Sequence, residues 1–146
     1  MYEEESKFLK QVEDPNDVTN DDREVLSDKQ IKILCEEYPG LPSDFLDYLR
    51  EVGWGSFREC GYTLHEPISP LSSYEGLLYP EDEPPTKNID NYLVFGDNFA
   101  GDSGMINIKT GKVAVHWHDS NEIYETNQSF REFIREAMEI DQPYES

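Results

Sequence analysis

The sequence predicts a single α+β domain in which helices flank a mainly antiparallel central sheet. Apolar residues recur at helical spacing between residues 28 and 52, and again between 130 and 140. Residues 92–117 hold three short apolar runs separated by glycine turns, which is typical of antiparallel strands. Helices set apart from a block of consecutive strands indicate an α+β fold. At 146 residues, the chain suits one domain with one core.

The first 26 residues form an acidic N-terminal arm whose structure the sequence specifies weakly. Phe8, Leu9 and Val12 have the spacing of a short helix, whereas residues 15–23 have the composition of a loop. The arm therefore fits two descriptions, a helix docked on the domain or a mobile acidic tail. We assign the domain to residues 27–141 and a C-terminal tail to residues 142–146.

Two helices follow the arm. Ser27 and Gln30 fit a capping box, and apolar side chains then recur at helical spacing up to residue 38. The second helix begins at residues 41–42, where Pro42 suits the first helical position because its missing N–H needs no partner there. Gly53 ends this helix.

Residues 55–90 carry weaker signals. One or two short strands fit residues 57–64, and a helical turn fits residues 72–79. Prolines at positions 67, 70, 80, 84 and 85, together with the acidic run of Glu81, Asp82 and Glu83, indicate a long irregular connection.

Strands are predicted at residues 92–95, 105–108 and 113–117, with an edge strand at 122–125. In the third of these strands Val113, Val115 and Trp117 alternate with His116, so the first three should face the core and the histidine an open face shared with His118. Ser129 and Glu132 then form a second capping box, which starts a closing helix that ends near residue 140.

The formal charge of −20 bears on the class of partner. A field of this sign repels phosphate groups, which argues against nucleic acid and anionic membranes as partners. It would instead steer a basic protein toward the chain. Neither a targeting signal nor an apolar run long enough for a membrane helix is apparent. With two unpaired cysteines, Cys35 and Cys60, we expect a cytoplasmic protein with free thiols.

A polar cluster near the end of the predicted sheet has the residue types of an active or metal site. It comprises Asp97, Asp102, Ser103, His116, His118 and Asp119. Two histidines two residues apart on a strand can share a metal ion, but a third histidine or cysteine at a useful spacing is missing. Residues 96–104 lack the ligand spacing of an EF-hand, and Ser103 lacks a nucleophile elbow. We therefore predict neither a catalytic residue nor a metal or cofactor, and interpret these aspartates and glycines as turn formers.

Three blocks of the sequence occur in the order found in a known family. They are residues 41–53 with Pro42 and Gly53, residues 93–113 with Gly96, Asp97, Gly101, Asp102 and Gly111, and residues 118–134 with His118, Asp119, Ser129 and Phe130. Together they resemble the SUKH superfamily, the Smi/Knr-like immunity proteins of bacterial polymorphic toxin systems, and the resemblance covers about residues 28–140.

The resemblance implies an α+β fold, no enzymatic activity, and binding to a cognate toxin, often a nuclease. An acidic surface would complement the basic substrate cleft of such a toxin. We predict its contacts to be Glu81, Asp82, Glu83, Asp97, Asp102 and Asp119. Other family members look like scaffolds, so an intracellular adaptor is the alternative, and a metal-dependent hydrolase using His116 and His118 is a third hypothesis.

Overall fold

The computed structural model of the protein describes residues 1–140 and confirms the predicted α+β fold. The helices are α1 (Glu3–Val12), α2 (Asp28–Glu37), α3 (Ser43–Glu51) and α4 (Phe130–Met138). The strands are β1 (Gly55–Phe57), β2 (Tyr62–Pro70), β3 (Tyr92–Asp97), β4 (Ser103–Asn107), β5 (Lys112–Trp117) and β6 (Glu122–Glu125). Three short 3-10 helices, η1 (Val18–Asp21), η2 (Leu71–Tyr74) and η3 (Ile89–Asn91), lie between them. The predicted tail at residues 142–146 falls outside the described residues.

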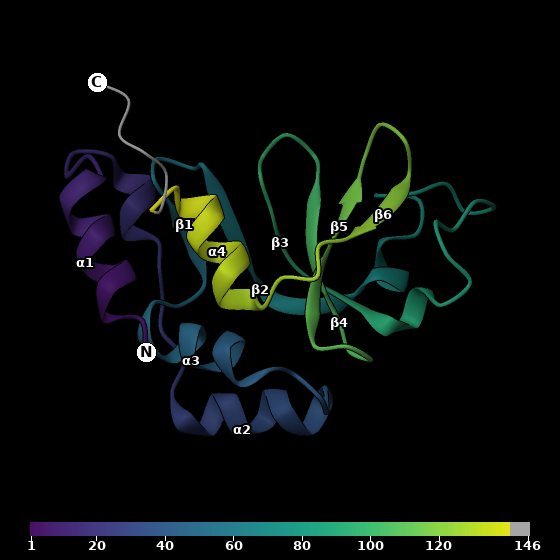
Figure 1. Ribbon diagram of the computed structural model, residues 1–146, viewed down its shortest axis with the longest axis horizontal. Helices are drawn as coiled ribbons and strands as arrows, with labels where there is room; N and C mark the ends of the chain where they lie inside the picture. The colour runs from purple at the N-terminus through teal and green to yellow at the C-terminus, as the bar shows by residue number, and fades with distance from the viewer. Residues whose placement is uncertain (141–146) are drawn as a thin grey trace.

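The strands form one antiparallel sheet in the order β1-β2-β3-β4-β5-β6, so each strand pairs with its neighbours in sequence. In such a meander, alternate turns lie at the same end of the sheet. The β3–β4 turn (residues 98–102) and the β5–β6 turn (residues 118–121) therefore share one end, and the β4–β5 turn lies at the other (Figure 1).

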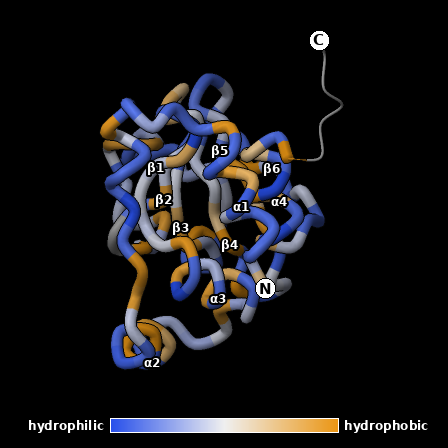
Figure 2. Tube along the Cα trace, turned by 90° about the vertical axis from the view of Figure 1, so that its left-hand side faces the viewer, coloured by the Kyte–Doolittle hydropathy of each residue, from blue (hydrophilic) through white to orange (hydrophobic). Residues whose placement is uncertain are grey.

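Both faces of the sheet are buried. In Figure 1 the helices gather at the left and below the strands, while the connection of residues 71–91 loops out at the right. The helix-side core contains Leu93, Phe95, Ile106 and Val113 of the sheet, with Phe45, Tyr48, Phe130 and Ile134 of the helices. The second core contains Leu71, Tyr79, Tyr92, Val94, Met105 and Ala114. Figure 2 shows the hydrophobic residues gathered along the strands, with hydrophilic segments in the outer loops.

The predicted faces of β5 are wrong at two positions. Trp117, expected in the core, is 40% exposed. His116, expected on an open face, is fully buried. The physical reason is that the connection of residues 71–91 covers the face that carries Ala114, so this face is a second core and not a solvated surface.

β2 is longer than the sequence predicts, because it continues through two prolines to residue 70. Its register against β3 shifts between Leu64 and Ser69. Proline is tolerated at such an irregularity, since the ladder is already interrupted there and no N–H is required. Pro70 lies at the last position of the strand, where Leu93 is its partner.

The helix boundaries follow the predicted signals closely. Both capping boxes, at Ser27 and at Ser129, are formed by their side chains as predicted. Pro42 is the N-cap of α3 and not its first helical residue. Gly53 follows α3 with a φ of +98°, and a Cβ added to it would lie 2.2 Å from the carbonyl oxygen of Glu24. A glycine is therefore required where the N-terminal arm crosses the end of α3.

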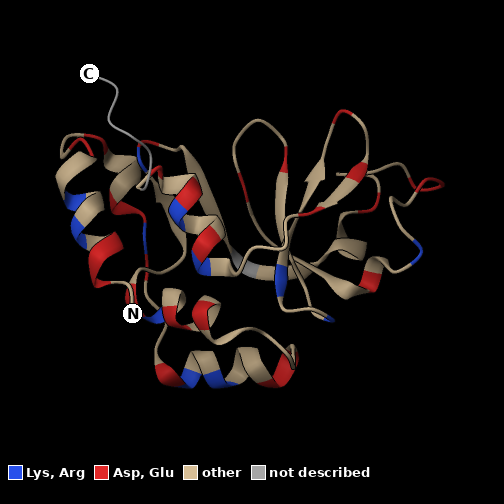
Figure 3. Ribbon diagram, in the orientation of Figure 1, with Lys and Arg blue, Asp and Glu red and all other residues tan. Residues whose placement is uncertain are grey.

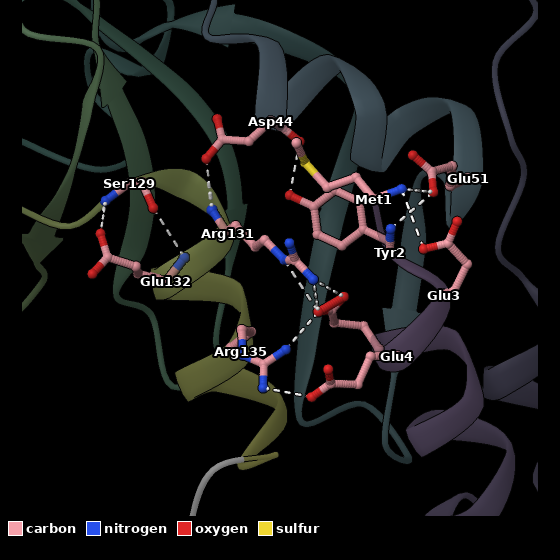
Figure 4. Close-up of polar contacts among 11 residues, drawn as sticks. Met1, Tyr2, Glu3, Glu4, Asp44, Glu51, Ser129, Arg131, Glu132 and Arg135 are labelled. Carbon is pink, nitrogen blue, oxygen red and sulfur yellow. Dashed lines mark hydrogen bonds and ion pairs between the residues drawn. The ribbon is translucent and has the colours of Figure 1, made fainter.

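The N-terminal arm is docked on the domain as a helix, which decides between the two descriptions that fit its sequence. Tyr2 and Glu5 are fully buried and Leu9 is 2% exposed. The Glu5 carboxylate lies 2.8 Å from a guanidinium nitrogen of Arg131 and 2.6 Å from one of Arg135. Figure 4 shows both arginines reaching from α4 toward α1. The acidity of the arm thus serves the fold in part, because one of its carboxylates forms a buried ionic cluster.

Candidate functional site

Acidic segments meet at the end of the sheet that carries the β3–β4 and β5–β6 turns. The tip of the long connection joins them, because the Asn121 side chain donates a hydrogen bond of 2.7 Å to the Glu83 carbonyl. The two turns meet where Asp102 Oδ1 lies 2.9 Å from His118 Nδ1. We call residues 81–83, 97–102 and 118–122 the acidic end. It contains the six predicted contact residues Glu81, Asp82, Glu83, Asp97, Asp102 and Asp119.

The acidic end has few basic residues nearby in sequence, the nearest being Lys87, four residues after Glu83. Neither residues 59–86 nor residues 113–130 contain a lysine or arginine. Lys109 and Lys112 lie at the opposite end of the sheet, and Figure 3 shows the two turns and the tip of the connection with acidic residues alone. Charges of one sign without intervening counter-charges produce a strong local field, which raises the encounter rate with a cationic partner.

The β3–β4 turn is held in shape by its own side chains. Asp97 Oδ1 accepts a hydrogen bond of 2.8 Å from the Phe99 N–H, and Asn98 Oδ1 accepts one of 2.9 Å from Ala100. Phe99 adopts a φ of +64° and is 55% exposed. A left-handed conformation is costly for an aromatic residue. The side-chain hydrogen bonds of the turn hold Phe99 in this conformation, with its ring exposed at the tip. Sequence reasoning missed Phe99, because glycine and asparagine in the loop gave no sign of which residue would be left-handed.

Asp102 and His118 form an ion pair across the two turns. The hydrogen bond with Asp102 raises the pKa of His118, with burial acting in the opposite direction and Asp119, 3.4 Å away, adding to the rise. Burial tends to raise the pKa of Asp102, but its hydrogen bonds from His118 and Asn98 lower the pKa overall. A Cβ on Gly101 would lie 3.0 Å from the His118 ring, so this glycine lets the ring approach the turn.

A second histidine pair lies on the other side of the same turn. His65 Nε2 is 2.6 Å from Asp97 Oδ2. The pair lines a pocket of about 270 Å³ whose other walls include Tyr74, Leu78 and Phe99. Sequence analysis did not pair these residues, because they are far apart in the chain and come together only when β2 pairs with β3.

The two histidines of the H-x-H motif occupy different surroundings. His116 Nε2 is 2.8 Å from the side-chain oxygen of Asn121, and the ring is buried. The ligand atoms of Asp102, His118 and Asp119 lie within 4.8 Å of one another, and His116 does not belong to this group. One imidazole and two carboxylates, of which Asp119 is exposed and Asp102 is partly buried, make a weaker ligand set than the three or four nitrogen and sulfur ligands of most zinc sites. The hydrolase hypothesis is left with one histidine where it required two.

Ser103 lies on β4 opposite His116, in register across the two strands. It is 2% exposed. Among the contacts of residues 1–140, none joins its hydroxyl to an imidazole nitrogen. Within this part of the chain, Ser103 therefore has no imidazole base at hydrogen-bonding distance.

An exposed aromatic pair adjoins the acidic end. The Trp117 and Tyr124 rings are stacked, with centroids 5.4 Å apart and an interplanar angle of 8°. Tyr124 is 52% exposed. Trp117 also lines a shallow hollow of about 340 Å³ together with Asp102 and Asp119. The sequence could have predicted this pair, because Trp117 and Tyr124 lie on either side of the HDSN turn, at positions that share one face of a hairpin.

The remaining motif residues of the predicted family shape the fold. A Cβ on Gly96 would lie 2.2 Å from the Thr63 carbonyl oxygen, and Gly111 has a φ of +73° in the β4–β5 turn. Phe130 is fully buried between α3 and the sheet. None of these three positions belongs to the acidic end.

The comparisons with known proteins returned no relative: no family model, no curated protein and no solved structure matches the chain. A search of the described residues for membrane-spanning helices found none of sufficient length and apolar character.

Proposed function

We propose that this chain is a non-enzymatic binding protein that takes a basic protein partner at its acidic end. The observation that carries the proposal is the meeting of three acidic segments, with no lysine or arginine in the flanking residues 59–86 and 113–130. Such a surface accelerates association with a cation-rich partner and discriminates against acidic ones.

Affinity needs apolar anchors in addition to charge, since surface charge mainly sets the rate of encounter and the choice of partner. Phe99, Trp117 and Tyr124 supply these anchors beside the acidic residues, and all three are at least 40% exposed. Aromatic residues surrounded by polar ones are the usual composition of an interface centre.

The class of partner that we propose is a bacterial toxin domain, which makes the chain an immunity protein acting in the cytoplasm. The proposal rests on the resemblance to the SUKH superfamily and on the basic cleft that a nuclease toxin must present to its substrate. Both cysteines are free, which suits a reducing compartment. An adaptor that uses the same surface for a basic partner of its own cell is the alternative. A toxin gene beside the gene for this chain favours immunity over the adaptor role.

The test uses calorimetry of the purified chain with the basic toxin domain encoded beside it, at low and at physiological salt. The test variant carries Glu81→Gln, Asp82→Asn and Asp119→Asn. The control variant carries Asp28→Asn, Glu36→Gln and Glu37→Gln. All six side chains belong to exposed residues, and both variants remove the same charge. We expect the test variant to bind on the order of tenfold more weakly at low salt and the control variant to bind nearly as well as the parent. Equal losses in both variants would mean that net charge, and not the acidic end, attracts the partner.

A further inference from the structure

The two edges of the sheet differ in whether they are covered. At the β1 edge the N-terminal arm occupies the backbone groups of Ser56. Its N–H donates to Asp22 Oδ1 at 2.9 Å, and its carbonyl accepts from Arg23 at 3.0 Å. Trp54, one residue before β1, exchanges two backbone hydrogen bonds with Glu24. A further strand cannot add at this edge without displacing the arm.

The β6 edge is open. Within residues 1–140, β6 pairs on one side only, with β5. The Thr126 N–H donates to the Val113 carbonyl at 3.1 Å, in the same register in which Tyr124 lies opposite Val115. Because inward and outward backbone groups alternate along an antiparallel strand, Ile123 and Glu125 direct their N–H and C=O groups away from β5. These are the groups that an added strand would pair with.

The open edge lacks three of the devices that protect an edge strand, namely proline, lysine and a bulge. β6 contains no proline and no lysine, and its pairing with β5 has no register shift. Its protection is its length of four residues and the acidity of Glu122 and Glu125, both of which are exposed. A second copy would bring the same carboxylates against these, so like charges oppose pairing between two β6 strands. A basic strand meets no such barrier.

From this contrast we infer that the partner of the acidic end adds an extended, basic segment as a seventh strand beside β6. The inference rests on the proposed function and specifies its binding mode. Main-chain hydrogen bonds to Ile123 and Glu125 would supply affinity, as in other cases of strand addition. Side chains would supply selectivity, because Tyr124 and Glu122 lie on one face of β6, where an arginine of the added strand can stack on the exposed ring and pair with the carboxylate.

The probe is an end-blocked heptapeptide that alternates arginine with valine, titrated at low salt into the ¹⁵N-labelled chain. A second peptide has the same side chains but is methylated at alternate backbone nitrogens. It keeps the charge of the first peptide and loses the backbone N–H groups with which an added strand would donate hydrogen bonds to β6. We expect the first peptide to slow hydrogen exchange at the amides of Ile123 and Glu125 by about tenfold or more. The methylated peptide should bind more weakly and leave these two amides unprotected.

A charge-matched pair of variants tests the role of the edge. Tyr124→Lys places a positive charge on the edge and removes the exposed ring. Ile33→Lys makes the same change of charge on α2, where Ile33 is 54% exposed. We expect Tyr124→Lys to weaken peptide binding by about tenfold or more and Ile33→Lys to weaken it by about twofold or less.

Three results would overturn the inference, and they separate it from the proposed function. Equal binding of both peptides, with shifts at residues 81–83 and 119 and none at β6, would refute strand addition and leave the acidic end as the binding surface. Failure of both peptides to bind at low salt would refute the proposed function itself. Concentration-dependent protection of the Ile123 amide in the free chain would show that a second copy, and not a basic partner, pairs with β6.

Discussion

Replacing Glu5 with alanine should destabilise the protein far more than the same change one residue earlier. Glu5 is fully buried, and its carboxylate contacts Arg131 and Arg135. Removing one member of a buried ionic cluster typically costs about 3–5 kcal/mol, because it leaves unpaired charge in the interior. The two arginine side chains are 35% and 19% exposed, so water compensates them in part. We therefore expect a loss of about 2–3 kcal/mol in the free energy of unfolding.

The matched control is Glu4→Ala on the same helix. Glu4 also pairs with Arg135, at 2.9 Å, but its side chain is 67% exposed. An exposed pair of this kind contributes about 0–1 kcal/mol. Urea unfolding followed by circular dichroism gives both free energies, and thermal melts should place the midpoint of Glu5→Ala about 5–10 °C below that of the parent.

If Glu5→Ala and Glu4→Ala lose the same free energy, the Glu5 cluster contributes no more than a surface ion pair. The docking of α1 would then depend on the apolar side chains of Tyr2 and Leu9 instead.

Two further predictions concern single residues. Gly53→Ala should lower the free energy of unfolding by about 2–4 kcal/mol, because it adds a side chain at a φ of +98° and against the Glu24 carbonyl. The control is Gly76→Ala, which has a φ of +79° and open space around it and should cost about 1 kcal/mol. Equal losses in denaturant melts would show that the clash with the Glu24 carbonyl does not destabilise the protein. The pKa of His118, measured by NMR, should lie above its ordinary value of 6.5 and return toward it in Asp102→Asn. Since folding raises this pKa, the ion pair stabilises the protein below pH 6.5 and loses its effect as the pH rises through the folded-state pKa. If Asp102→Asn leaves the His118 titration unchanged, Asp102 is not the cause of the raised pKa.

Much of the fold could be predicted from local signals. The capping boxes at Ser27 and Ser129 determine where two helices begin, because each is complete within four residues. The β3, β4 and β5 strands follow from short apolar runs between turns. Local patterns of this kind are reliable where the neighbouring segments in the chain are also the neighbours in space.

The predictions that failed concern residues whose surroundings are determined by segments distant in the sequence. His116 is buried because residues 71–91 cover its face, and nothing near His116 in the chain indicates this cover. The His65–Asp97 pair likewise depends on the register of β2 against β3. The candidate surface was predicted through its acidic residues, since glutamates and aspartates in loops are visible in sequence. Its aromatic residues were missed or assigned to the core, because exposure is a property of the assembled sheet.

The contact between Glu5 and α4 also has a consequence for the order of folding. Each strand of the meander pairs with the next in sequence, so the sheet can grow by successive hairpins with little loop-closure entropy. The Glu5–Arg131 contact, by contrast, joins residues 126 positions apart. During synthesis α1 leaves the ribosome before α4, so the arginines that pair with Glu5 are absent until α4 has emerged, whereas the partners of Tyr2 on α3, Asp44 and Glu51, emerge earlier. The Glu5 cluster can therefore form only after α4 is in place, and it reports that the two ends of the described domain have come together.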